Sequence, residues 1–128
     1  MSAHTIVNLM SIEGGEAARA AGIEAHFGRS HIGSEHLGVS LFTYPPGYRP
    51  TSGHHHREQE EAYVVIGGSG QVKLDDEVFD IAQWDVVRVS PEVTRGFRAG
   101  PDGLEVIAVG SDRPEGGDGS LVKDWWPE

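Results

Sequence analysis

The chain has 128 residues, a formal net charge of −10 at pH 7 and no cysteine. This length predicts a single domain over residues 1–128, large enough to bury roughly two thirds of the surface that its unfolded chain exposes. The acidic balance argues against binding to nucleic acid or to an anionic membrane surface, and the lack of cysteine excludes disulfides and thiolate metal sites.

The first 22 residues predict a lead-in to this domain and not a domain of their own. Ile6–Ile12 is apolar, and residues 13–22 are expected to form one short helical turn that ends at Gly22. Residues 1–30 show no basic start followed by an apolar run of secretory length, and no apolar run in the chain reaches about 18 residues. We therefore expect a cytoplasmic protein that does not bind membranes.

From Ile23 onward, runs of strand-forming residues alternate with Gly, Pro, Asp and Ser. This pattern is typical of an all-β protein, an antiparallel sandwich or barrel. Asp75-Asp76 is expected to form a tight hairpin turn, because Asp tolerates positive φ, and Gly67–Gly70 is expected to form another turn. The expected strands are 23–27, 38–44, 62–66, 71–74, 78–81, 86–89, 96–99 and 104–109.

Two histidines and one glutamate form the strongest chemical pattern in the sequence. In an extended strand successive side chains point to opposite faces, so His54 and His56 project to one side and His55 to the other. Glu61 begins the strand-forming run that follows. If both strands lie in one sheet, the three side chains can converge on one metal ion. Imidazole nitrogens with one carboxylate oxygen suit Zn, Fe, Mn, Ni or Cu, and do not suit Ca or Mg.

The three adjacent histidines could instead form a solvated loop that collects metal adventitiously. A loop cluster, however, does not need to be followed at fixed spacing by a carboxylate at a strand start and then by a glycine-rich segment. A purification tag is also a poor explanation, because the run is internal and acidic residues interrupt it.

The spacing of this pattern resembles the first sequence motif of the cupin superfamily. That motif is His-x-His, four residues, Glu, six residues, Gly, and it matches His54, His56, Glu61 and Gly68. The segment 70–81 is similar to the hairpin that follows the motif. The resemblance implies a double-stranded β-helix, or jelly-roll barrel, with a divalent metal on the two histidines and the glutamate.

The segment 84–97 resembles the second cupin motif in a degraded form. Trp84 stands where the family has Gly, Pro91 lacks the Gly that usually follows it, and Arg95 stands where the family has its fourth ligand, a His. Arginine offers no lone pair to a metal, so the four-ligand site is incomplete. The resemblance divides the chain into an N-terminal lead-in (1–22), a motif-bearing barrel (37–109) and a C-terminal tail (111–128).

Strand alternation predicts that Arg95 needs a partner. If Glu61 faces the barrel interior, so do Tyr63 and Val65, and Arg95 shares a face with Phe97. An inward Arg95 could pair with Glu61 through a bidentate ion pair, which would leave the metal site vestigial. It could instead bind a carboxylate or phosphate of a substrate, or the backbone could turn it to solvent.

Two classes of function follow. In the first, the protein is a metal-dependent enzyme of dioxygenase, isomerase, decarboxylase or hydrolytic type that acts on a small oxygenated molecule. Arg95 would then be an anion clamp and Tyr63 an acid or hydrogen-bond donor, although Tyr63 could equally be ordinary barrel filling. In the second, the protein is a non-catalytic cupin that binds a small molecule at a drifted site, with anions among the candidate ligands.

The C-terminal tail carries two adjacent tryptophans at an otherwise polar end. Residues 113–120 have loop composition and precede Trp125 and Trp126. We expect these rings to pack back on the sheet or on a partner subunit. Together with the apolar lead-in Ile6–Ile12 they offer more apolar surface than a small barrel can hide, which predicts a homodimer.

Overall fold

The computed structural model describes residues 3–127, so the ends of the predicted domain, residues 1, 2 and 128, lie outside the described residues. The elements in chain order are η1 (Leu9–Ser11), α1 (Glu16–Ala20), β1 (Glu24–Phe27), α2 (Arg29–Ile32), β2 (Gly38–Tyr44), β3 (Gly53–His56), β4 (Glu61–Leu74), β5 (Glu77–Ala82), β6 (Val86–Val89), β7 (Arg95–Gly110) and β8 (Gly119–Val122). No helix among the described residues is long and apolar enough to cross a membrane.

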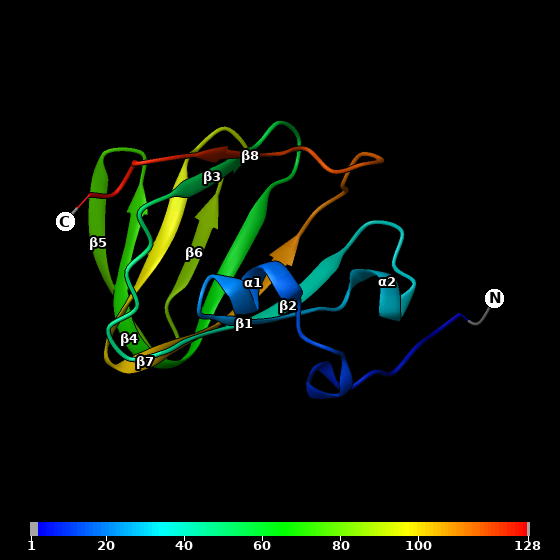
Figure 1. Cartoon of the computed structure of the whole chain (residues 1–128). Coiled ribbons are helices and arrows are strands. Elements are labelled where there is room, and N and C mark those ends of the chain that lie inside the picture. The colour runs from blue at the N-terminus through cyan, green and yellow to red at the C-terminus, as the bar shows by residue number, and fades with distance from the viewer. Residues whose placement is uncertain (1–2, 128) are drawn as a thin grey trace.

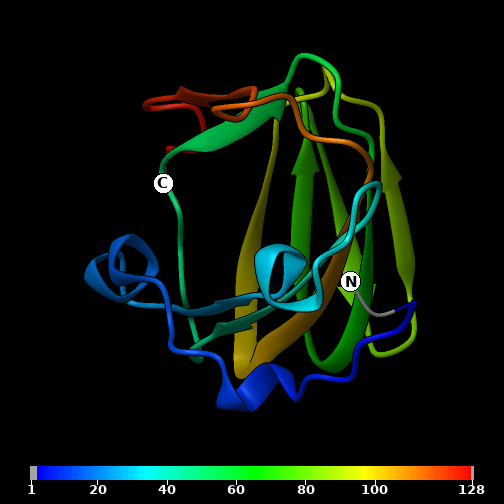
Figure 2. The ribbon, with the colours of Figure 1, turned by 90° about the vertical axis from the view of Figure 1, so that its right-hand side faces the viewer.

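Two long strands, β4 and β7, run through both layers of the molecule (Figures 1 and 2). The first half of β4 pairs with β6 on one edge and with the second half of β7 on the other, and the layer continues to β2 and β1. The second half of β4 pairs with β5 and with the first half of β7, and this layer continues to β3 and β8. All pairings are antiparallel. This arrangement confirms the predicted antiparallel jelly-roll barrel.

The glycine-rich segment 67–70 bends β4 and does not end it, so the prediction of a turn there was wrong. The register of β4 against β7 shifts between Val65 and Gly67 and again between Gly68 and Gly70. Gly68 has φ 73°, and a Cβ at this position would lie 2.0 Å from the carbonyl oxygen of Gly103. Glycine is needed here for both reasons, the backbone angle and the close approach. The expected strands 62–66 and 71–74 are therefore two halves of one bulged strand, as are 96–99 and 104–109.

Several local predictions are confirmed. Asp75 has φ 52° in the β4–β5 hairpin, and Gly22 ends the turn after α1 with φ 86°.

Trp84, which stands where the second cupin motif has Gly, has φ 77°. That region of backbone space favours glycine, so the substitution strains the turn before β6.

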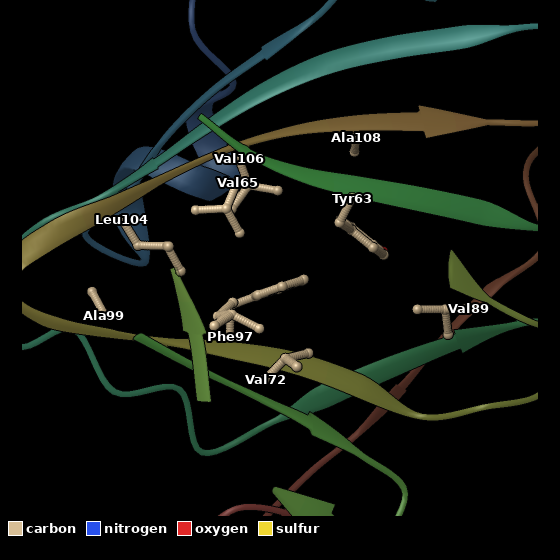
Figure 3. Close-up of a cluster of buried hydrophobic side chains, with 10 residues drawn as sticks. Tyr63, Val65, Val72, Val89, Phe97, Ala99, Leu104, Val106 and Ala108 are labelled. Atoms are coloured by element: carbon tan, nitrogen blue, oxygen red, sulfur yellow. The ribbon is translucent and has the colours of Figure 1, made fainter. Parts of the chain in front are cut away.

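The core lies between the two layers and is built mainly from β4 and β7, with one residue each from β5 and β6 (Figure 3). Tyr63 and Val65 of β4 point inward, with 3% and 0% of their surface exposed, and Phe97 of β7 meets the ring of Tyr63 at 4.8 Å between centroids. Burying one such side chain contributes roughly 1.5–3 kcal/mol. The alternation expected from the sequence therefore places the site-bearing strands against the core.

The C-terminal tail packs on the outside of the second layer. Its strand β8, which the sequence did not predict, lies antiparallel beside β3 across one end of the barrel (Figure 1). Trp126 is buried, and the ammonium of Lys73 lies 4.5 Å from the ring centroid of Trp125. A Cβ at Gly53 would lie 2.4 Å from the Trp125 ring, so the first residue of β3 is tightly packed against the tail. The expectation that the tryptophans fold back onto the sheet is confirmed.

Candidate metal centre

The three predicted ligands come together at one end of the barrel. His54 and His56 alternate along β3, and Glu61 is the first residue of β4, after a loop that carries the chain from one layer to the other. One ligand atom from each residue lies within 4.8 Å of the others. The side chains of His56 and Glu61 are 12% and 13% exposed, whereas that of His54 is 44% exposed. The cluster is thus open on the side of His54.

One oxygen of Glu61, Oε1, lies at the centre of the cluster. It is 3.2 Å from His56 Nε2 and 3.7 Å from His54 Nε2, and it accepts hydrogen bonds from the Tyr63 hydroxyl and from Arg95 Nη2 at 2.9 Å. All four contacts are made to Oε1, and Oε2 takes no part in them.

Arg95 lies behind Glu61 and is fully buried. Its Nη1 donates to the carbonyl oxygens of Pro91 at 3.0 Å and Val93 at 2.6 Å, and its Nε donates to the Tyr63 hydroxyl at 3.3 Å. The alternative in which Arg95 points to solvent is therefore excluded. It pairs with Glu61, but through one nitrogen and one oxygen. The pair is not the bidentate pair that would occupy the whole carboxylate.

Asp118, in the tail, completes the cluster and was not predicted from the sequence. Its Oδ1 accepts a hydrogen bond from His56 Nδ1 at 2.9 Å, and its Oδ2 accepts from the backbone N–H groups of Glu58 and Gln59 at 2.7 and 2.9 Å. The carboxylate thereby fixes both the His56 ring and the loop that leads to Glu61. The residue lies 62 positions from His56 in a segment of loop composition, where no local pattern marks it.

The His56 ring is oriented to bind a cation through Nε2. A carboxylate only accepts hydrogen bonds, so Asp118 requires the proton on Nδ1, and the neutral ring then turns the lone pair of Nε2 toward Glu61. That nitrogen is buried and has no hydrogen-bond partner of suitable geometry. Two acceptors that face each other at 3.2 Å need a positive charge between them, either a proton or a metal ion. A carboxylate on the distal nitrogen is also the common support of a metal-binding histidine, so the donor set fits a divalent transition metal.

The charges of the cluster shift the pKa values of its members. The carboxylate of Glu61 is the main cause that raises the pKa of His56 above 6.5, against the opposing effect of burial, and Asp118 adds to it. Burial acts to raise the pKa of Glu61, but hydrogen bonds from His54, His56 and Tyr63 together with the charge of Arg95 outweigh it and lower the pKa. Burial raises the pKa of Tyr63. At neutral pH, Glu61 is therefore ionised and Tyr63 is a neutral hydrogen-bond donor.

The cluster opens into a cavity of about 400 Å³ at the barrel mouth, whose wall includes His54, His56 and Glu61. Phe27 and Phe42 form an apolar part of its wall, with ring centroids 5.7 Å apart. Tyr63 and Arg95 do not line this cavity. Another hollow, of about 490 Å³, lies over β5 and the second half of β4, but none of the three ligands lines it, so the chemistry points to the cavity beside the cluster.

Comparison with known proteins agrees with the architecture. No protein-family model and no curated protein matches the sequence. Among solved structures, a cupin protein from Bacteroides fragilis is 17% identical over 89% of this chain and 88% of its own, with a TM-score of 0.70. The chain has the cupin fold.

Other solved structures extend this comparison. KdgF from a Halomonas species is 16% identical over 88% of this chain and 96% of its own chain, with a TM-score of 0.68. A variant of PAC13 from Streptomyces, solved with uridine, is 15% identical over 91% of this chain and 89% of its own chain, with a TM-score of 0.71. At these identities the likeness shows the fold, and the candidate site of this chain rests on its own geometry.

Proposed function

We propose that this cupin binds one divalent transition metal, Fe, Mn, Ni, Zn or Cu, through His54, His56 and Glu61, and that it is an enzyme acting on a small oxygenated molecule. The observation that carries the proposal is the buried Nε2 of His56, which faces Glu61 Oε1 at 3.2 Å while Asp118 holds the opposite nitrogen. The cavity beside the cluster provides room for a small molecule.

The metal would supply Lewis-acid or redox chemistry at positions that its three protein ligands leave open. The residues around it have separate tasks. Asp118 keeps His56 in the tautomer that binds a cation, and Tyr63 holds Glu61 by a hydrogen bond. Because Arg95 also contacts Glu61 and does not line the cavity, we place Tyr63 and Arg95 as positioning residues that act through this carboxylate. Dioxygenase, isomerase, decarboxylase and hydrolytic reactions all remain compatible with this arrangement.

A second candidate function is a non-catalytic cupin that binds a small molecule without metal. The ion pair between Arg95 and Glu61 favours it, because a buried guanidinium already supplies a positive charge beside the carboxylate. The PAC13 variant with uridine supports a small-molecule ligand for a protein of this fold.

We also propose that the protein is a cytoplasmic homodimer. The lead-in exposes Ile6 at 95% and Met10 at 63%, and β6 exposes Val86 at 64%. Trp126 contributes less to this surface than expected, because it is buried on its own sheet. Apolar groups exposed in this number favour contact with a second copy.

Metal content decides between the two candidate functions. Protein purified without an affinity tag would be analysed for transition metals by elemental mass spectrometry, beside the His56→Ala variant. We expect near-stoichiometric metal in the wild type and loss of most of it in a variant that still folds, because the barrel has its own hydrophobic core. Absence of metal from the wild type, even after incubation with each ion, would favour the non-catalytic binder. Equal metal in both proteins would place the ion on other histidines.

A further inference from the structure

We infer that the cavity beside the metal centre takes a small organic anion, and that Arg29 and Arg113 bind its oxyanion group, a carboxylate or a phosphate. Both residues line the cavity with His54, His56 and Glu61. The inference deepens the proposed function and rests on it for the choice of this cavity as the ligand site.

The charge balance of the cavity is opposite to that of the whole chain. The chain carries a net charge of −10, yet the two carboxylates of the cavity wall already have partners. Glu61 pairs with Arg95, and Asp118 pairs with His56 and two backbone N–H groups. Among the described residues, neither of the cavity's two arginines forms an ion pair with a carboxylate. With Arg95 included, the site holds three guanidinium groups and two carboxylates, so its net charge is positive even with both histidines neutral.

Arg29 is half-buried and is held in place by neutral acceptors. Its Nη2 donates to the carbonyl oxygen of Ser111 at 2.5 Å, to Gln59 Oε1 at 3.0 Å and to the carbonyl oxygen of Gly110 at 3.4 Å. A Cβ at Gly38 would lie 2.6 Å from the same nitrogen, so this position leaves room for the guanidinium. These acceptors orient Arg29 without neutralising it, and its Nε and Nη1 are not used in these bonds. An oxyanion could accept hydrogen bonds from these two nitrogens.

Arg113, unlike Arg29, is exposed. It lies in the segment between β7 and β8. This segment leads directly to Asp118, which is anchored to His56, so it stays at the cavity mouth. An exposed arginine there can turn to a bound anion at little desolvation cost. Phe27 and Phe42 offer an apolar wall to the rest of the molecule. A ligand with an apolar or aromatic body and an oxyanion group matches this lining.

In this assignment Arg29 and Arg113 bind the anion, and Arg95 does not. The guanidinium of Arg95 donates to Glu61, Tyr63, Pro91 and Val93, and it is fully buried behind the cluster. A ligand in the cavity reaches Arg29 and Arg113 first.

The test uses the whole protein in its metal-free form, so that its outcome is independent of metal binding. Salicylate and phenyl phosphate serve as anionic probes, and salicylamide serves as the uncharged match for salicylate. Binding would be followed by amide chemical shifts in two-dimensional NMR. We expect both anions to shift resonances of the cavity residues and salicylamide to bind more weakly. The tighter of the two anions would identify the oxyanion as a carboxylate or a phosphate.

Variants assign this binding to the two arginines. Arg113→Gln should weaken binding of the tighter-binding anion by about tenfold, and Arg113→Lys should restore part of the lost affinity. Adding Arg29→Gln should weaken it further, whereas Arg19→Gln, which makes the same charge change on α1, should have no effect. The inference is overturned if neither anion binds, if salicylamide binds as tightly as salicylate, or if Arg113→Gln leaves both affinities unchanged. Failure of the proposed metal function would appear instead in the metal content of the wild type.

Discussion

Replacing Arg95 by histidine tests how the buried guanidinium affects the metal centre. The side chain is fully buried, and its Nη2 lies 2.9 Å from the Glu61 oxygen at the centre of the cluster. Histidine at this position would remove a positive charge and would offer a nitrogen where the cupin motif has its fourth ligand. We expect Arg95→His to bind a divalent metal more tightly than the wild type.

The expected size follows from the charge that is removed. A unit charge about 5 Å from a metal ion, in an effective dielectric of about 20, contributes roughly 3 kcal/mol of repulsion per unit charge of the ion. Against this, the carbonyl oxygens of Pro91 and Val93 lose their donor, which costs about 1–3 kcal/mol each in folding stability. That cost applies with and without metal. We therefore expect the variant to be less stable and yet to bind metal at least about tenfold more tightly, equivalent to about 1.4 kcal/mol.

The assay is a Zn²⁺ competition titration against a chromogenic chelator at about pH 7.5, where an unperturbed histidine is neutral. Arg88→His is the matched control, because Arg88 is exposed on β6 and pairs with Glu60 outside the cluster. Thermal unfolding of both variants would show how much of each remains folded. A folded Arg95→His protein with unchanged Zn²⁺ affinity would refute the reasoning and would mean that the guanidinium does not oppose metal binding.

Four further outcomes are expected. Asp118→Asn should lower metal affinity by about 10- to 100-fold, because an amide has one acceptor oxygen and cannot accept both from His56 Nδ1 and from the backbone N–H groups of Glu58 and Gln59, and an unchanged titration would remove Asp118 from the site. Gly68→Ala should cost about 3 kcal/mol or more in urea unfolding, whereas Gly47→Ala, with a similar positive φ but no atom within 4 Å of the added Cβ, should cost about 1 kcal/mol; equal losses would contradict the close approach. Trp84→Gly should be about 1 kcal/mol more stable than Trp84→Ala, since both remove the exposed ring and glycine alone relieves the positive φ. Light scattering should return a dimer, and a mass near 13.8 kDa at micromolar concentration would exclude it.

The sequence by itself determined the fold class and the three candidate ligands. Alternation and β-branched runs are local signals, and they placed most of the strands and the inward faces of Tyr63 and Val65. The spacing of His54, His56 and Glu61 predicted the candidate ligands because it too is a local signal. Two of these residues share one short strand, and the third begins the next strand.

Only the tertiary structure decided how the glycines, the tail and the arginines are used. Gly67–Gly70 could be a turn or a bulge, and the choice was made by a partner strand that approaches Gly68 from Gly103, far along the chain. The strand β8 has mostly exposed residues and no alternation, and it forms because β3 offers a free edge. Local patterns carry no record of such pairings.

The environment of the metal centre was likewise decided by long-range contacts. Asp118 meets His56 across 62 residues, and Arg95 meets Glu61 across 34. The sequence allowed Arg95 three different partners, because strand alternation gives the direction of a side chain and not the group that faces it. Barrel closure brings these groups together, and it separates arginines that the sequence presents alike: Arg95 is buried against Glu61, and Arg29 and Arg113 face the cavity.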